Sequence, residues 1–222
     1  MSADDFSHVE TWVFDLDNTL YPPEMALFEQ INARMTAYVM TELGVGAAEA
    51  DRLRHDYYHA HGTTLAGLMA DHGVDPEPFL DDVHRIDFSV LHPDPDLIAA
   101  IAALPGRRII YTNGTAPYAR AVIEHRGLSD LFDAVYGVEH AGFRPKPERA
   151  AFDAVFAQDG FEPARAAMFE DEPRNLAVPF AMGMRTVHVA KTPVVADHIQ
   201  YHTSDLAHFL HPLSGGPVKG AA

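Results

Sequence analysis

The chain has 222 residues, of which 47% are hydrophobic and 22% charged, so it carries enough apolar material for one sizeable core. Its 16 Lys and Arg against 32 Asp and Glu give a net charge of −16, which argues against binding to a nucleic acid polymer or an anionic membrane. The chain has no cysteine, which excludes disulfides, thiolate metal sites and a cysteine nucleophile. Its polar start and the lack of a long apolar run predict a cytoplasmic protein with no membrane span.

The first part of the chain predicts one strand followed by helices. Residues 11–14 are β-branched or aromatic and run into a turn at 15–19, which is typical of a buried strand that ends in a polar loop. Apolar residues then recur at helical spacing over four segments, 24–43, 47–61, 63–71 and 76–85. Residues 22–92 are therefore predicted to be entirely helical.

From residue 93 onward, helices alternate with short apolar strands. The predicted helices are 96–104, 116–126, 147–158 and 174–182, and the strands that they precede are 108–111, 134–136, 166–169 and 186–189. This alternation predicts an α/β fold with a Rossmann-like, doubly wound, mostly parallel sheet. Strand 11–14 joins that sheet, so the α/β core is predicted to comprise 1–21 and 93–212, with 22–92 an inserted helical cap domain and 213–222 a disordered tail.

Polar residues follow four separate segments of the predicted sheet, at the edge where an open α/β sheet binds ligands. Taken singly, each has an ordinary explanation as a turn residue, a helix cap or a surface lysine. Their joint occurrence at strand ends instead indicates a site. The residues are Asp15 and Asp17 after the first strand, Thr112, Asn113 and Gly114 after the second, then Lys146, and finally Glu170 and Asp171.

The chemistry that suits this set is phosphoryl transfer through a carboxylate. Asp15 would attack phosphorus, and Asp17 would protonate the leaving oxygen and then activate water. The hard oxygen ligands favour Mg²⁺, held by the carboxylates of Asp15 and Asp171 and by a backbone carbonyl at Asp17. The substrate phosphate would bind Lys146 and the group of donors at the second strand, Thr112, Asn113 and Gly114.

Four ordered motifs resemble those of the haloacid dehalogenase (HAD) superfamily. They are residues 13–20 (Val-Phe-Asp-Leu-Asp-Asn-Thr-Leu), 111–114 (Tyr-Thr-Asn-Gly), Lys146, and 169–171 (Phe-Glu-Asp) with Asn175. The resemblance implies a HAD-like fold with a C1-type cap and a Mg²⁺-dependent aspartyl-phosphate mechanism. It also implies that Glu170 and Asn175 stand in a second layer behind the metal ligands Asp15, Asp17 and Asp171.

The resemblance also narrows the activity. Members of the superfamily that remove halide lack the aspartate two residues after the nucleophile, so the presence of Asp17 disfavours a dehalogenase. Asn18 and Tyr21-Pro22 are similar to the branch that contains pyrimidine 5′-nucleotidases. The implied substrate is a small phosphorylated metabolite, with a pyrimidine nucleoside 5′-monophosphate favoured.

Other functions stay open. A sugar-phosphate phosphatase, a phosphotransferase or a mutase would use the same fold, and a catalytically silent binding or regulatory protein is the alternative of another class. The silent alternative predicts loss of a core residue, yet all of them are intact: Asp15, Asp17, Thr112, Lys146 and Asp171. The sequence allows either a monomer or a homodimer.

The cap contains an unusual stretch at residues 55–61 (His-Asp-Tyr-Tyr-His-Ala-His). His55 and His59 share a helix face at metal-ligand spacing, but no third ligand accompanies them. Alternatively, Tyr57, Tyr58 or a neighbouring histidine faces the site and recognises the leaving group, or the stretch is a solvated helix face. Arg174 either supports Glu170 or Asp171 or is exposed.

Overall fold

The computed structural model describes residues 3–213 of the chain. A parallel sheet in the order β3-β2-β1-β4-β5-β6 forms its centre. The strands are β1 (Thr11–Phe14), β2 (Arg107–Tyr111), β3 (Ala134–Tyr136), β4 (Ala166–Glu170), β5 (Arg185–Val189) and β6 (Tyr201–Thr203). Strand β1 lies between β2 and β4 and is buried along its whole length, as its apolar sequence predicts. The predicted α/β fold with a parallel sheet is confirmed.

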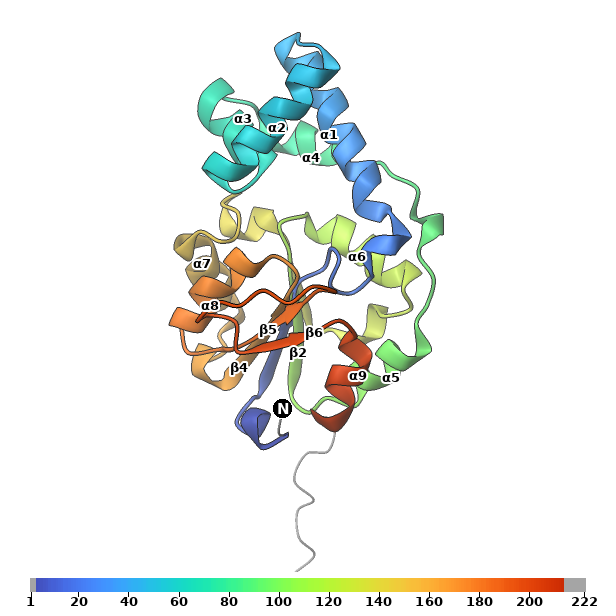
Figure 1. Cartoon of the computed structure of the whole chain (residues 1–222), viewed down its shortest axis with the longest axis vertical. Helices are drawn as coiled ribbons and strands as arrows, with labels where there is room; N and C mark the ends of the chain where they lie inside the picture. Colours follow the sequence, from blue (N-terminus) through green and yellow to red (C-terminus); the bar gives the residue numbers. More distant parts are fainter. Residues whose placement is uncertain (1–2, 214–222) are drawn as a thin grey trace, which may run out of the picture.

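Helices cover both faces of this sheet (Figure 1). Trp12 and Phe14 belong to one hydrophobic cluster and Val13 to another, because alternate residues of a strand point to opposite faces. Helices α5, α6 and α9 contribute to the first cluster, and α7 and α8 to the second. These helices are α5 (Pro95–Ala102), α6 (Ala116–His125), α7 (Arg149–Asp159), α8 (Ala177–Ala181) and α9 (Leu206–Leu210).

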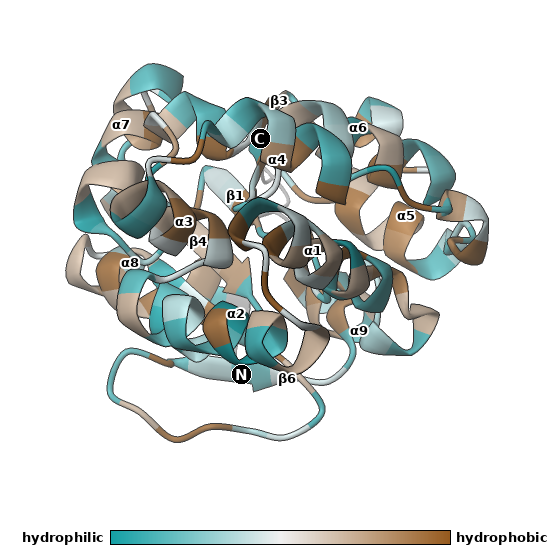
Figure 2. Cartoon of the chain, turned by 90° about the horizontal axis from the view of Figure 1, so that it is seen from above, coloured by the Kyte–Doolittle hydropathy of each residue, from teal (hydrophilic) through white to brown (hydrophobic). Residues whose placement is uncertain are grey.

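Four further helices, all between β1 and β2 in the chain, form a separate helical layer at one end of the molecule (Figure 1). We call this layer the cap; its helices are α1 (Leu27–Leu43), α2 (Ala47–His61), α3 (Thr64–His72) and α4 (Pro76–Val83). Viewed from above, the cap helices lie over the strands (Figure 2). The cap is consistent with the predicted insertion, and the exact limits of 22 and 92 stay a prediction.

Short 3-10 helices connect the main elements. They are η1 (Ala3–Phe6), η2 (Pro23–Met25), η3 (Phe88–Val90), η4 (Ser129–Leu131), η5 (Val138–Ala141), η6 (Pro163–Arg165), η7 (Pro173–Leu176) and η8 (His211–Leu213). The helix expected from residue 24 is interrupted, because Ala26 adopts a left-handed conformation with φ of 55° between η2 and α1. The helix expected at 174–182 is likewise divided into η7 and α8.

The sequence prediction missed β6 and α9, which are too short to give a clear periodicity. Leu213, the first residue of the predicted disordered tail, ends η8 and is buried, whereas 214–222 lie outside the described residues. Within residues 3–213, no helix combines the length and apolar character that a membrane span requires.

Candidate active site

The loop after β1 places Asp15 at the carboxyl edge of the sheet. Its backbone N–H still donates to the carbonyl of Phe169 at 2.9 Å, so Asp15 continues the pairing with β4. The side chain is only 5% exposed, and its Oδ2 accepts a hydrogen bond of 3.1 Å from the Thr19 hydroxyl. Asn18 has a positive φ of 59°, which turns the chain back after the strand. This tight turn holds the carboxylate of Asp15 firmly.

Lys146 is the cation of the site. Its Nζ donates to Asp15 Oδ1 at 2.7 Å, to Glu170 Oε2 at 2.6 Å and to the carbonyl of Tyr111 at 3.0 Å, so all three of its protons are bound. The side chain is 1% exposed. Burial alone opposes the charge of Lys146, but the carboxylates of Asp15 and Glu170 outweigh burial and hold the pKa of the amine above its usual range. Lys146 is therefore an ammonium bound by two carboxylates.

Three carboxylates converge beside this lysine. Oxygens of Asp15, Glu170 and Asp171 lie within 4.8 Å of one another. Burial, followed by the charge of Asp15, raises the pKa of both Glu170 and Asp171, because three carboxylates face a single ammonium. An all-oxygen group with uncompensated negative charge is chemically suited to a hard divalent cation such as Mg²⁺.

Neighbouring amides orient these acids. Asn18 Nδ2 donates to Asp171 Oδ2 at 3.1 Å, and Asn175 Nδ2 donates to Glu170 Oε1 at 3.1 Å. Asn175 thus contacts Glu170, and its place in a second layer behind the metal ligands stays a prediction. Glu170, in contrast, was expected only in that second layer, yet its carboxylate belongs to the group of three and also binds Lys146.

The carboxylate of Asp17 lies outside the three-carboxylate group and is bound by two tyrosines. Its Oδ1 accepts hydrogen bonds from the hydroxyls of Tyr21 at 2.6 Å and Tyr118 at 2.5 Å. Burial and then the charge of Asp15 raise the pKa of Asp17 to about 6, against the opposing effect of these two hydrogen bonds. Asp17 is thus separate from the three-carboxylate group, and a metal contact through its backbone carbonyl stays a prediction.

The segment after β2 lines the same site. The Thr112 hydroxyl accepts from the Gly114 N–H at 2.9 Å, and the side chain of Asn113 exchanges hydrogen bonds of 2.8 and 3.2 Å with the backbone of Lys146. In this structure, therefore, the Gly114 N–H binds within its own turn, and the Asn113 side chain holds the lysine segment. A Cβ on Gly114 would lie 2.7 Å from Tyr118 Cδ1, so glycine is needed for this close approach.

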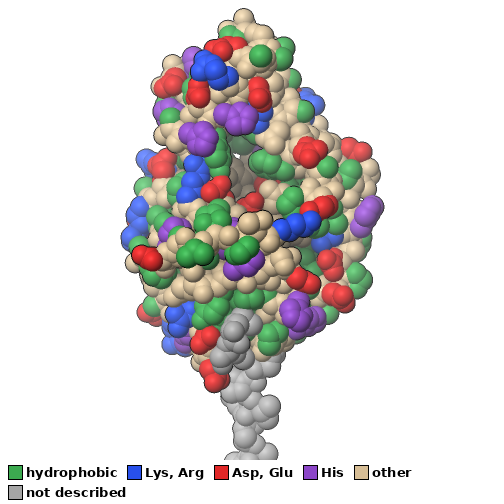
Figure 3. Space-filling model, viewed as in Figure 1, with side chains coloured by type: hydrophobic (Ala, Val, Ile, Leu, Met, Phe, Trp, Pro, Cys, Tyr) green, Lys and Arg blue, Asp and Glu red, His purple; other side chains and the backbone are tan. Residues whose placement is uncertain are grey.

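A cavity of about 450 Å³ lies between these residues and the cap. An opening between the cap and the sheet layer is visible in Figure 3. The cap walls of the cavity include the apolar side chains of Phe28, Ile31, Met35, Phe79 and Leu80. Arg54 of α2 also lines it. Its guanidinium donates to Asn32 Oδ1 at 2.6 Å and to Thr36 Oγ1 at 2.8 Å, while its buried Nε has no hydrogen-bond partner among the described residues.

Arg174 connects the core to the cap. It donates to the carbonyls of Tyr58 at 3.1 Å and Gly62 at 3.0 Å, and its guanidinium lies 3.8 Å from the Tyr58 ring centroid. The Tyr58 hydroxyl in turn donates to Glu172. Arg174 thus holds the end of α2, and no contact with Glu170 or Asp171 is found for its guanidinium among the described residues.

The structure also distinguishes the residues of the histidine-rich stretch. His55 and Tyr58 line the cavity, whereas the Tyr57 hydroxyl is hydrogen-bonded to His72 within the cap at 2.6 Å. His55 and His59 do not belong to any group of three metal-ligating side chains in residues 3–213.

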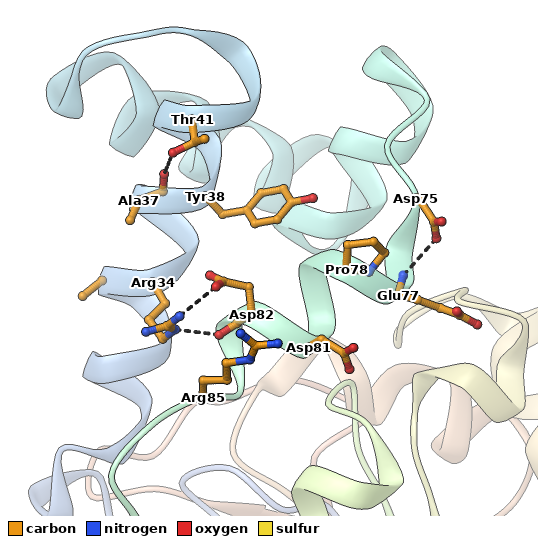
Figure 4. A pocket seen from close by; sticks show the side chains of 11 residues that line it. Arg34, Ala37, Tyr38, Thr41, Asp75, Glu77, Pro78, Asp81, Asp82 and Arg85 are labelled. Atoms are coloured by element: carbon orange, nitrogen blue, oxygen red, sulfur yellow. Dashed lines mark hydrogen bonds and ion pairs between the residues drawn. The ribbon is translucent and has the colours of Figure 1, made fainter.

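A larger surface hollow, of about 880 Å³, lies between α1 and α4 (Figure 4). Arg34 and Asp82 line it and form an ion pair of 2.7 Å with each other. None of the polar residues that follow the strands line this hollow. The smaller cavity, which contains Asp15 and Lys146, is therefore the candidate active site.

Comparison with known proteins agrees with this geometry. The family of haloacid dehalogenase-like hydrolases matches residues 9–183, and the chain belongs to this family. The superfamily predicted from the four motifs is confirmed, and with it the expectation of a HAD-type hydrolase. The pyrimidine 5′-nucleotidase branch is a finer assignment that this match does not address.

Two curated relatives share most of the chain. Phosphate metabolism protein 8 of Saccharomyces cerevisiae is 26% identical over 79% of this chain, which spans 60% of that protein's length. A phosphoglycolate phosphatase of Rhodospirillum rubrum is also 26% identical, over 79% of this chain and 77% of its own length. A shorter match, 33% identical over 43% of this chain and 39% of the relative, is to an (S)-2-haloacid dehalogenase of Xanthobacter autotrophicus.

Solved structures share the fold. A HAD phosphatase of Thermococcus onnurineus matches with a TM-score of 0.64 at 20% identity, covering 94% of this chain and 99% of its own. CbbY of Rhodobacter sphaeroides, solved with phosphate, has a TM-score of 0.61 at 19% identity, covering 92% and 99%. YfnB of Bacillus subtilis, solved with magnesium, has a TM-score of 0.58 at 17% identity, covering 92% and 98%.

Proposed function

We propose that the protein is a Mg²⁺-dependent phosphomonoesterase that hydrolyses a small phosphorylated metabolite through an aspartyl-phosphate. The observation that carries this proposal is the pairing of two different carboxyl groups in one loop. Asp15 is bound to Lys146 beside Glu170 and Asp171, and Asp17 is held apart from them by tyrosine hydroxyls. A nucleophile and a separate proton donor are what phosphate-ester hydrolysis by covalent catalysis requires.

In the first step, a carboxylate oxygen of Asp15 forms a bond to phosphorus while the bond from phosphorus to the leaving oxygen breaks. The electron pair of that bond stays on the leaving oxygen, which takes a proton from Asp17. Lys146 compensates negative charge next to Asp15, to which it is bonded at 2.7 Å. The products of this step are the free alcohol and an aspartyl-phosphate at Asp15.

In the second step, water attacks phosphorus and the bond to Asp15 breaks, which releases phosphate and restores the carboxylate. Asp17, now ionised, accepts the proton of the water. The elevated pKa of Asp17, about 6, suits a group that both gives and takes a proton near neutral pH. Asp15 and Asp171, with Glu170 beside them, would hold Mg²⁺. When bound, Mg²⁺ would stabilise the negative charge of the transferring phosphoryl group.

The cap cavity supports a substrate with a flat, partly apolar leaving group. Phe28, Ile31 and Met35 offer apolar contacts, and the same cavity is lined by Arg54, whose buried Nε has no hydrogen-bond partner in the part of the chain that the structure describes. A pyrimidine base has both an apolar face and carbonyl acceptors, and Asn18 with Tyr21-Pro22 resembles the nucleotidase branch. We therefore favour a pyrimidine nucleoside 5′-monophosphate as the substrate.

A small carboxylated or sugar phosphate is the second candidate. The similarity to the phosphoglycolate phosphatase of Rhodospirillum rubrum favours it, since the Arg54 guanidinium would bind a carboxylate as readily as a base carbonyl. Dehalogenation is disfavoured despite the partial match to a dehalogenase, because Asp17 supplies the proton donor that ester cleavage needs.

The test is phosphate release from a panel of UMP, CMP, dUMP, AMP, GMP, 2-phosphoglycolate, sugar phosphates and p-nitrophenyl phosphate, with Mg²⁺ and with EDTA. We expect pyrimidine monophosphates to lead, activity to require Mg²⁺, and Asp15→Asn to be inactive. A preference for 2-phosphoglycolate or a sugar phosphate would select the second candidate. No hydrolysis of any ester, or full activity of Asp15→Asn, would refute the phosphatase mechanism and favour a binding protein.

A further inference from the structure

We infer that Tyr21 and Tyr118 are positioning residues that orient the Asp17 carboxyl group so that its Oδ2 exchanges the proton with the leaving oxygen and with water. This inference rests on the phosphatase function proposed above and adds to it a role for two residues outside the predicted catalytic set. It is carried by hydrogen bonds, burial and packing around Asp17.

Both tyrosine hydroxyls donate to the same oxygen. Tyr21 and Tyr118 reach Asp17 Oδ1 at 2.6 and 2.5 Å. A carboxylate oxygen has two lone pairs, so these bonds occupy Oδ1 and leave Oδ2 as the place for the transferable proton. A carboxyl group with a fixed orientation presents this proton in a defined direction, which an unconstrained carboxyl would not do.

The two tyrosines come from different parts of the chain and are both rigidly packed. Tyr21 is 1% exposed and lies four residues after Asp17, on the turn that follows β1. Tyr118 is 3% exposed and lies in the first turn of α6, where its backbone N–H is bonded to the Thr115 hydroxyl at 3.3 Å. Asp17 is thus held from two independent directions.

The cap supports Tyr118 from its other side. The ring of His84, the residue after α4, stacks on the Tyr118 ring with centroids 4.3 Å apart and planes 7° apart. His84 also lines the active-site cavity, and its Nδ1 lies 3.4 Å from the Thr115 hydroxyl. Gly114, which lacks a side chain, leaves the space that the Tyr118 ring fills. The position of Tyr118 is therefore set by both the core and the cap.

A positioning role makes a prediction that depends on the leaving group. An alkoxide leaves poorly without a proton, whereas nitrophenolate is stable enough to leave unprotonated. Loss of orientation at Asp17 must therefore slow the cleavage of alkyl phosphates while sparing p-nitrophenyl phosphate. Breakdown of the aspartyl-phosphate must also slow, since Asp17 activates the water in that step.

The experiment compares Tyr118→Phe, Tyr21→Phe and the double variant on p-nitrophenyl phosphate and on the best alkyl phosphate of the panel. We expect each single variant to lower kcat/KM for the alkyl ester roughly 10- to 100-fold, which is at or below the lower end of the roughly 10²- to 10⁴-fold contribution typical of general acid–base catalysis, because the Asp17 carboxyl group itself is kept. The kcat/KM for p-nitrophenyl phosphate should stay nearly unchanged. A burst of nitrophenol should appear before the steady state, because the aspartyl-phosphate accumulates.

Tyr136→Phe is the matched control. It too removes a buried tyrosine hydroxyl that donates to a carboxylate, Oδ2 of Asp159 at 2.9 Å, but on the far side of β2 from β1. We expect it to leave both substrates and the burst unaffected. Circular dichroism and thermal melting establish that each variant is folded, and if Tyr118→Phe does not fold, Tyr21→Phe decides the question.

Two results would overturn the inference. Either the single variants retain wild-type kcat/KM for the alkyl ester, or both esters slow by the same factor without a burst, as a general loss of structure would cause. Failure of the proposed function is a different result, because the wild-type protein itself would then release no phosphate from either ester.

Discussion

Replacing Lys146 by methionine tests whether this buried ammonium neutralises the acidic site. Methionine keeps the length and most of the volume of lysine but has no charge. Lys146 Nζ lies 2.7 Å from Asp15 Oδ1 and 2.6 Å from Glu170 Oε2. At an effective dielectric constant of about 20, each contact corresponds to a Coulomb attraction of roughly 6 kcal/mol before desolvation is counted.

Desolvation offsets much of that attraction, and the loss of one partner from a buried ion pair typically costs about 3–5 kcal/mol. We expect the free energy of unfolding of Lys146→Met to fall by about this amount in EDTA. Mg²⁺ should stabilise the variant more than the wild type, because the group of three carboxylates then lacks the ammonium that is hydrogen-bonded to two of them, Asp15 and Glu170. Phosphatase activity should be lost under both conditions.

Urea unfolding followed by circular dichroism, in EDTA and in Mg²⁺, measures these differences. Lys191→Met is the control, since Lys191 pairs with Glu24 at an exposed position, and surface pairs are worth about 0–1 kcal/mol. A neutralising role for Lys146 is contradicted if Lys146→Met destabilises the protein no more than Lys191→Met, or if Mg²⁺ stabilises the variant and the wild type equally.

Three further predictions concern His84, Gly114 and Arg54. Burial lowers the pKa of His84 to about 4, so as the pH falls from 6.5 towards 4 the unfolded chain binds a proton that the folded chain does not. The free energy of unfolding should therefore decline in that window by up to about 3 kcal/mol. The urea midpoint of His84→Gln should depend less on pH than that of the wild type. Gly114→Ala should lower the free energy of unfolding by about 1–3 kcal/mol, and with it the melting temperature, since the added methyl group would lie 2.7 Å from the Tyr118 ring. An unchanged melting temperature would contradict this. Arg54→Met should raise KM for the best panel substrate about tenfold, which corresponds to the loss of roughly one charged hydrogen bond. The effect on KM for p-nitrophenyl phosphate should be smaller. Equal effects on both substrates would exclude a role of Arg54 in leaving-group recognition.

The sequence by itself determined the architecture and the edge at which the site forms. The segment that forms β1 is β-branched or aromatic, and β2, β3, β4 and β5 each follow a helix, so a parallel sheet covered on both faces is the arrangement that buries them. The carboxyl ends of parallel strands meet at one edge. Asp15 and Asp171, which directly follow β1 and β4, could therefore be assigned to one edge from chain order, and the motif resemblance added Lys146. The three side chains do line one cavity.

Tertiary structure decided which way those side chains point and what they touch. Asp17 turns from Asp15 towards Tyr118, 101 positions along the chain. The Arg174 guanidinium binds the end of α2 and pairs with Glu172 at 3.8 Å, rather than with Glu170 or Asp171. Local periodicity reports the buried face of an element, but it carries no information about which side chains meet between distant elements. Those contacts depend on how the cap and the helices pack around the sheet, and that packing is a property of the whole chain.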